Sequence, residues 1–213
     1  MLPARSAEYD GVIGLLRSRG VAGAEDFGRF VNDTRCLERS TFDDRAALPV
    51  LLDVLPTLDD PKAVAAAARH VRSRWLRGDA FDVLRDTYLR WAHRSPSSDA
   101  AWALGDALAK ATDATRAPEL VELATNPYLG ASRQQIAGSL WRFRKTLDVA
   151  PSLRALVHDP DVSLVAVSAL GRVIAPEAMV PVLEDAIELC ERSQDRKVLE
   201  RELRRYRKKL EPR

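Results

Sequence analysis

Apolar residues recur along the chain at spacings of three and four, the period of an α-helix that packs one face against a neighbour. The clearest segment is 151–184, PSLRALVHDPDVSLVAVSALGRVIAPEAMVPVLE. A short first helix ends at His158–Asp161, because the residue before a proline is disfavoured in the α region and aspartates suit turns and N-caps. A second helix follows, with an apolar stripe from Val162 to Val173. Neither helix buries its stripe alone, so the pattern predicts that such pairs stack on one another.

The same rhythm covers most of the chain. The pair that begins at Pro118 precedes the pair at Pro151 by 33 residues, a period typical of helical-repeat proteins. We place Pro49 in the first turn of its helix, where proline is tolerated. The pattern predicts an all-α fold, whose other expected helices cover residues 7–19, 25–31, 47–58, 62–75, 80–92, 99–111, 177–192 and 194–210.

The order Leu-x-x-Leu, Asp-Pro-Asp-Val, Ala-Leu-Gly, Pro-Glu-Ala and Pro-x-Leu in residues 153–183 resembles a HEAT repeat, particularly the short bacterial form. The resemblance implies a right-handed α-solenoid of about four or five HEAT-like helical hairpins. We expect a single domain, 1–213, with an N-terminal helical cap at 1–41, the repeats at 42–193 and a basic C-terminal capping helix at 194–213.

The resemblance also concerns charge. The family usually has an arginine at the position of Ser163, where it joins a ladder of aspartates and arginines along the solenoid, and Arg133 matches that arginine in the preceding pair. We therefore expect the ladder to be incomplete at Ser163. Stacking would then rely on apolar faces more than on charge.

Composition limits the class of protein. Hydrophobic residues make up 46% of the chain and charged residues 30%, and no apolar run approaches the roughly 20 residues that a membrane helix needs. Without an apolar signal core near the start, we expect a cytoplasmic protein. The abundance of Ala, Arg, Val and Asp indicates a high-GC bacterial genome. Cys36 and Cys190 are far apart and form no motif, so we expect reduced thiols.

No catalytic constellation is visible. His70, His93 and His158 are scattered, and none has Cys, Asp or Glu at metal-ligand spacing, so structural or surface roles are favoured. We expect no catalytic residue, no cofactor and no metal. The tryptophans fall at helical core spacings, which favours core packing: Trp75, Trp91, Trp102 and Trp141.

Cations near the second helices are the candidate partner-binding residues: Arg72, Arg74, Lys110, Arg133, Arg142, Arg144, Lys145 and Arg172. Most follow an apolar stripe, where a cation complements the helix dipole by about 0.3 to 1 kcal/mol, and this interpretation is favoured. The alternative is a basic ridge for an acidic protein or a nucleic-acid backbone, on which we expect Arg133 and Arg142 to be exposed.

Charge is unevenly distributed. The chain carries a formal net charge of +2, but residues 195–213 carry +5, which leaves −3 for the remainder. The run Arg204–Lys209 is therefore a second candidate for binding nucleic acid, anionic lipid or an acidic partner. A solvated helix face is the favoured interpretation.

These patterns favour a non-enzymatic HEAT-repeat module or scaffold that binds a protein partner, acidic in character, on its curved second-helix surface. The alternative is a DNA-binding protein or a HEAT-like alkylpurine DNA glycosylase, a family of similar length that uses aromatic and acidic residues on a concave basic surface. No segment matches that family well enough to assign a catalytic residue. Nucleic acid is thus the less favoured partner.

Overall fold

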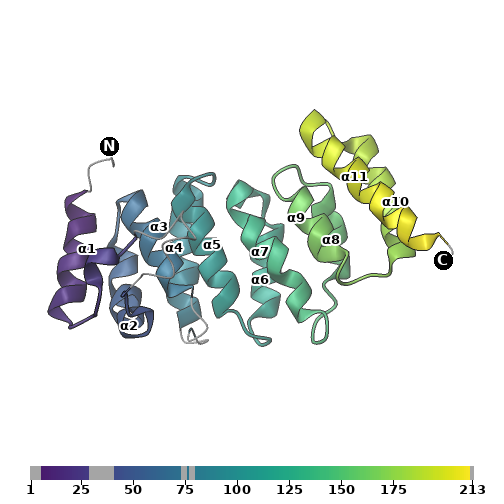
Figure 1. Ribbon diagram of the computed structural model, residues 1–213. Helices are drawn as coiled ribbons and strands as arrows, with labels where there is room; N and C mark the ends of the chain where they lie inside the picture. The colour runs from purple at the N-terminus through teal and green to yellow at the C-terminus, as the bar shows by residue number, and fades with distance from the viewer. Residues whose placement is uncertain (1–5, 29–40, 73–75, 77–79, 212–213) are drawn as a thin grey trace. The chain divides into compact units, whose positions relative to one another are not determined.

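The computed structural model describes residues 6–28, 41–72, 76 and 80–211. Within these residues the secondary structure consists of eleven α-helices, several short 3-10 helices and no strand, which confirms the all-α prediction (Figure 1). The chain forms two compact units, Met1–Thr112 and Asp113–Arg213, which are described separately. That the whole chain is a single domain stays a prediction.

Unit 1 is built from helices that pack on their neighbours in the chain. α1 packs on α2 and α3, α2 pairs with α3, α4 pairs with α5, and α3 lies along α5. Alternate helices run in opposite directions (Figure 1). The elements are α1 (Ala7–Ser18), η1 (Ala24–Asp26), α2 (Asp44–Val54), η3 (Leu55–Thr57), α3 (Pro61–Val71), α4 (Phe81–Arg94) and α5 (Asp99–Ala111).

Polar caps set where the helices of unit 1 begin. The Asp60 carboxylate accepts a hydrogen bond from the Ala63 amide at 2.7 Å, so α3 starts at Pro61. Asp43 caps α2 in the same way. This early start places Pro49 inside α2, so its expected place in the first turn is wrong. The capping carboxylate starts the helix ahead of the apolar run, and proline then interrupts the backbone hydrogen bonds.

His70 joins three segments of unit 1. The Gly28 amide donates to His70 Nε2 at 3.2 Å, and Nδ1 lies 2.7 Å from Asp44 Oδ1. The ring therefore contacts a backbone amide through one nitrogen and a carboxylate through the other. The ring lies 5.4 Å from that of Phe27 and 4.3 Å from that of Phe42, measured between centroids. His70 thus has the structural role that its sequence context favours.

Unit 2 consists of three helix pairs. α6 pairs with α7, α8 with α9, and α10 with α11. The first helices α6, α8 and α10 pack in succession, and so do the second helices α7, α9 and α11 (Figure 1). The elements are α6 (Ala117–Thr125), η5 (Pro127–Arg133), α7 (Gln134–Ser139), η6 (Leu140–Phe143), α8 (Ala150–Val157), α9 (Ser163–Leu170), α10 (Pro176–Leu189) and α11 (Ser193–Leu210).

The core of unit 2 follows the predicted stripes. Leu153, Leu156 and Val157 of α8 are buried, as are Ala166 and Leu170 of α9, and the two helices pack on each other. None of the helices in the described part of the chain combines the length and apolar character that a membrane span requires.

We expect His70→Ala to destabilise unit 1 by about 2 to 3 kcal/mol, because it leaves the Gly28 amide without an acceptor and removes the ring between two phenylalanines. Urea unfolding followed by circular dichroism measures the change. His93→Ala, at an exposed position, is the matched control and should stay within about 0.5 kcal/mol. Equal effects of the two substitutions would contradict the assigned role.

Candidate functional site

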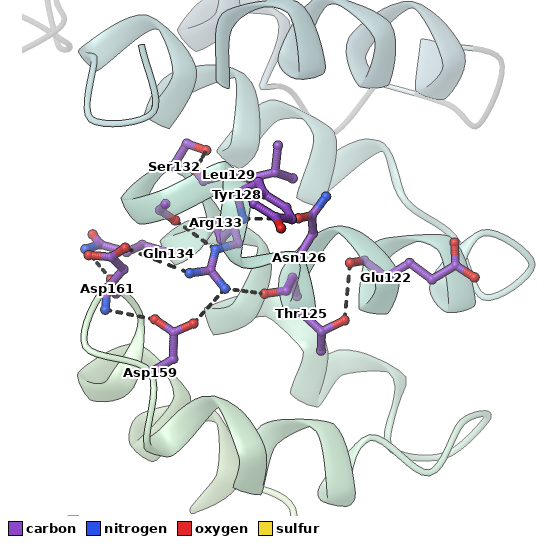
Figure 2. A network of polar contacts seen from close by, with 12 residues as sticks. Glu122, Thr125, Asn126, Tyr128, Leu129, Ser132, Arg133, Gln134, Asp159 and Asp161 are labelled. Atoms are coloured by element: carbon purple, nitrogen blue, oxygen red, sulfur yellow. Dashed lines mark hydrogen bonds and ion pairs between the residues drawn. The ribbon is translucent and has the colours of Figure 1, made fainter. Parts of the chain in front are cut away.

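The side chain of Arg133, at the end of η5, is buried and only 1% exposed. Its Nε donates to the Gly130 carbonyl at 2.9 Å, and Nη1 donates to the Ala124 carbonyl at 3.1 Å (Figure 2). Gly130 has φ 52° and ψ −144°, a conformation that only glycine adopts readily, and it presents this carbonyl to the guanidinium. These two hydrogen bonds from Arg133 therefore stabilise the turn that follows α6.

The same guanidinium reaches the next helix pair. Nη1 of Arg133 lies 2.9 Å from Asp159 Oδ2, and Nη2 lies 4.0 Å from Asp161 Oδ2 (Figure 2). The Gln134 side chain adds a hydrogen bond from Nε2 to the Asp161 carbonyl at 2.9 Å. Arg133 links two consecutive pairs, and its expected exposure for partner binding is wrong. Its charge is used inside the fold, where a buried guanidinium needs a carboxylate.

Arg192 continues these charge contacts from the opposite side. Its Nη1 donates to the Pro160 carbonyl at 2.7 Å, and Nη2 lies 3.7 Å from Asp161 Oδ1. Asp161 therefore lies between Arg133 and Arg192, and the contacts connect all three pairs of unit 2. Ser163 contributes no charge, and Arg192, from the turn after α10, reaches back to the preceding pair from a different position. That the family's ladder is incomplete at Ser163 stays a prediction.

A second group of cations surrounds Trp141. The guanidinium carbons of Arg144 and Arg172 lie 5.2 and 4.5 Å from the Trp141 ring centroid. Arg144 also donates from Nη1 to the Trp141 carbonyl at 3.1 Å. We call Trp141, Arg144 and Arg172 the Trp141 cluster. Its indole is half-buried, so it is a cation platform as well as a packing residue.

Two further predicted residues are close to this cluster along the chain. Arg142 lies over Phe143, with 5.4 Å between its guanidinium carbon and the ring centroid. Lys145 is exposed. The structure thus gathers Arg142, Arg144 and Lys145 where η6 ends, and Arg172 joins them from the end of α9.

A cleft of about 310 Å³ lies between α9 and α11. Tyr206 lines it, with Lys209 Nζ 4.6 Å and the Arg205 guanidinium carbon 5.8 Å from the ring centroid. Arg172 lines the α9 wall and so belongs to both the cleft and the Trp141 cluster. Burial raises the pKa of the Tyr206 phenol above its ordinary value. We call this the Tyr206 cleft.

The remaining predicted cations are described in unit 1 or lie outside the described residues. Arg72 caps α3 and pairs with Asp106, with 2.6 Å between Nη1 and Oδ2. Lys110 is exposed in the last turn of α5, where it complements the helix dipole. Arg74 is outside the described residues. A basic ridge shared by all pairs stays a prediction.

Arg205, Tyr206 and Lys209 of the cleft were not among the eight candidate partner-binding residues, although the run Arg204–Lys209 that contains them was the second binding candidate. The apolar seam of α11 correctly predicts that Tyr206 is buried, and its exposed fraction is 5%. The spacing gave a signal for Lys209, because a residue three positions after a helical tyrosine lies on the same helix face. The cations of Arg204–Lys209 are exposed, as the favoured interpretation of a solvated face predicts, and Arg205 and Lys209 also line the cleft beside Tyr206.

No group of three His, Cys, Asp or Glu side chains that could hold a metal ion occurs within the described residues. His93 and His158 are exposed, and Cys190 is a free thiol. Cys36 and Trp75 lie outside the described residues. Trp91 is buried, as predicted, with 3% of its surface exposed.

Comparisons of the chain with protein-family models, with curated proteins and with solved structures found no match. The resemblance to HEAT repeats therefore stays a prediction.

We expect Arg133→Met to destabilise the protein by about 3 to 5 kcal/mol, because methionine fills part of the volume but leaves Asp159 and two carbonyl groups without their donor. Chemical unfolding of the full chain measures the loss. Arg154→Met, at an exposed position of α8, is the control and should change stability by less than about 0.5 kcal/mol. A loss below 1 kcal/mol for Arg133→Met would show that the network contributes little.

Proposed function

We propose that the chain is a non-enzymatic, right-handed α-solenoid of HEAT-like hairpins that binds an acidic protein partner on the second-helix surface of unit 2. Two features support the solenoid. First helices pack on first helices and second helices on second helices, and Arg133 and Arg192 connect the turns of successive pairs. The cytoplasmic location and bacterial origin stay predictions.

The observation that carries the proposal is the continuity of the Trp141 cluster with the Tyr206 cleft. Arg172 lies over the Trp141 ring and also lines the cleft, so cations of η6, α9 and α11 form one surface. Within the described residues neither Arg172 nor Lys209 has a carboxylate partner. Exposed cations beside the half-buried indole of Trp141 and the buried ring of Tyr206 form a surface that attracts and orients an anionic partner.

A protein partner suits this surface better than a nucleic acid. The Glu202 carboxylate also lines the cleft, where it pairs with Arg205 at 2.9 Å. A nucleic-acid backbone carries a phosphate at every nucleotide and is repelled by a carboxylate in its track. The carboxylates of a polypeptide need not occur at every residue, so a polypeptide can bind a surface that carries both cations and a carboxylate. DNA binding and glycosylase activity remain the alternative, because aromatic and basic side chains occur together here.

The test is fluorescence anisotropy of a labelled peptide rich in Asp and Glu, titrated with the full chain. We expect saturable binding that weakens with salt, and a loss of about tenfold in affinity for the double variant Arg144→Gln and Arg172→Gln. The matched control, Arg154→Gln and Lys197→Gln, makes the same change in net charge at exposed positions outside both features.

If both double variants lose affinity for the peptide equally, the loss depends only on net charge, and the proposed surface is contradicted. A labelled DNA duplex is titrated in parallel at about 50 mM salt. Tighter binding of the duplex than of the acidic peptide would overturn the choice of partner in favour of nucleic acid.

A further inference from the structure

The hydroxyl group of Tyr206 lies in the Tyr206 cleft without a hydrogen-bond partner among the described residues. The side chain is otherwise enclosed, since the residue is only 5% exposed. It rests against Gly171, where an added Cβ would meet the Tyr206 oxygen at 1.9 Å. The hydroxyl oxygen is not one of the fully enclosed side-chain atoms, so it opens into the cleft, where its O–H group can donate a hydrogen bond to a ligand.

Cations around this hydroxyl indicate the charge of the acceptor. Arg172, Arg205 and Lys209 line the cleft together with one carboxylate, that of Glu202. Glu202 is engaged by Arg205, which leaves Arg172 and Lys209 to act on a ligand. A donor hydroxyl with two such cations favours an anionic oxygen over a neutral one, because hydrogen bonds to charged acceptors are the stronger ones.

The shape of the cleft limits the kind of anion. Its volume of about 310 Å³ is at the lower end of the range for small-ligand pockets, which suits one side chain and the backbone that carries it. Leu164, Val167 and Val198 contribute apolar wall, against which methylene groups pack. Glu202 adds a negative charge that opposes a phosphate dianion more strongly than a carboxylate monoanion.

We propose that the Tyr206 cleft binds a glutamate side chain of the acidic partner, with the carboxylate accepting a hydrogen bond from the Tyr206 hydroxyl between Arg172 and Lys209. The two methylene groups lie along the apolar wall of α9 and α11. This inference rests on the proposed function and deepens it: the surface attracts acidic segments by charge, and the cleft selects one residue within them.

Tyr206→Phe tests the inference, because it retains the ring and all charges and removes only the hydroxyl. In the anisotropy titration with the acidic peptide we expect about a tenfold loss of affinity. The matched control is Tyr128→Phe, the same change at a residue 83% exposed in η5. Circular dichroism verifies that both variants are folded.

The outcomes separate the two proposals. If Tyr206→Phe binds like the parent protein while the Arg144→Gln and Arg172→Gln variant loses affinity, the surface stands and the glutamate pocket is overturned. If the parent protein binds no acidic peptide, the proposed function fails.

A second measurement examines the cleft without any peptide. N-acetylglutamate and inorganic phosphate are titrated separately into the full chain, and the Gly171 amide is followed by NMR. We expect saturable shifts with N-acetylglutamate that disappear in Tyr206→Phe. Saturation by phosphate alone would overturn the choice of a carboxylate, and shifts by neither anion would overturn the pocket.

Discussion

A guanidinium that is buried inside a protein must keep its charge and find acceptors for its N–H groups within the fold. Arg133 meets this requirement with two carbonyl groups of its own helix pair and the carboxylates of the next. Desolvation makes each of these contacts necessary, since losing one leaves a buried charge poorly compensated. These contacts fix the distance between the first two pairs of unit 2 where the turn after α6 meets the turn after α8. Apolar packing between the helices holds the rest of the two pairs together.

The same side chain type serves two purposes in unit 2, and solvent exposure separates them. Arg133 is buried, and its charge is compensated by the carboxylates of Asp159 and Asp161. Arg144 and Arg172 lie over the indole of Trp141, which is only half-buried. Both follow the end of a helix, where the backbone carbonyl groups favour a cation. Helix-dipole compensation and partner attraction are therefore compatible roles for these two residues.

Much of the fold was predictable from local patterns, because helix starts depend on residues close in sequence. Asp60 before Pro61 predicts where α3 begins, and the spacing of Leu153 and Leu156 predicts the buried face of α8. Pro49 shows the limit: a cap at Asp43 extended α2 backwards and changed the position of the proline within it. Helix boundaries are the part of such predictions that tertiary context alters most readily.

The candidate site was less predictable, because its determinants lie on different helices. The resemblance to HEAT repeats matched Arg133 to an arginine that joins a charge ladder, but two of its acceptors are backbone carbonyls that no residue type identifies. Periodicity predicted correctly that Tyr206 is buried, yet its free hydroxyl becomes visible only when Gly171 is placed beside it. Contacts between pairs depend on how helices stack, which the pattern of one helix does not contain.

Gly171 has a thermodynamic consequence. Its missing side chain lets Tyr206 approach α9, so the cleft exists only while α11 is docked on α9 and α10. A ligand that binds this docked state and not an opened one stabilises it by an amount that grows with the logarithm of ligand concentration. Opening of a single helix often requires less free energy than global unfolding. Ligand occupancy and hydrogen-exchange protection of α11 are thus two measures of one coupled equilibrium.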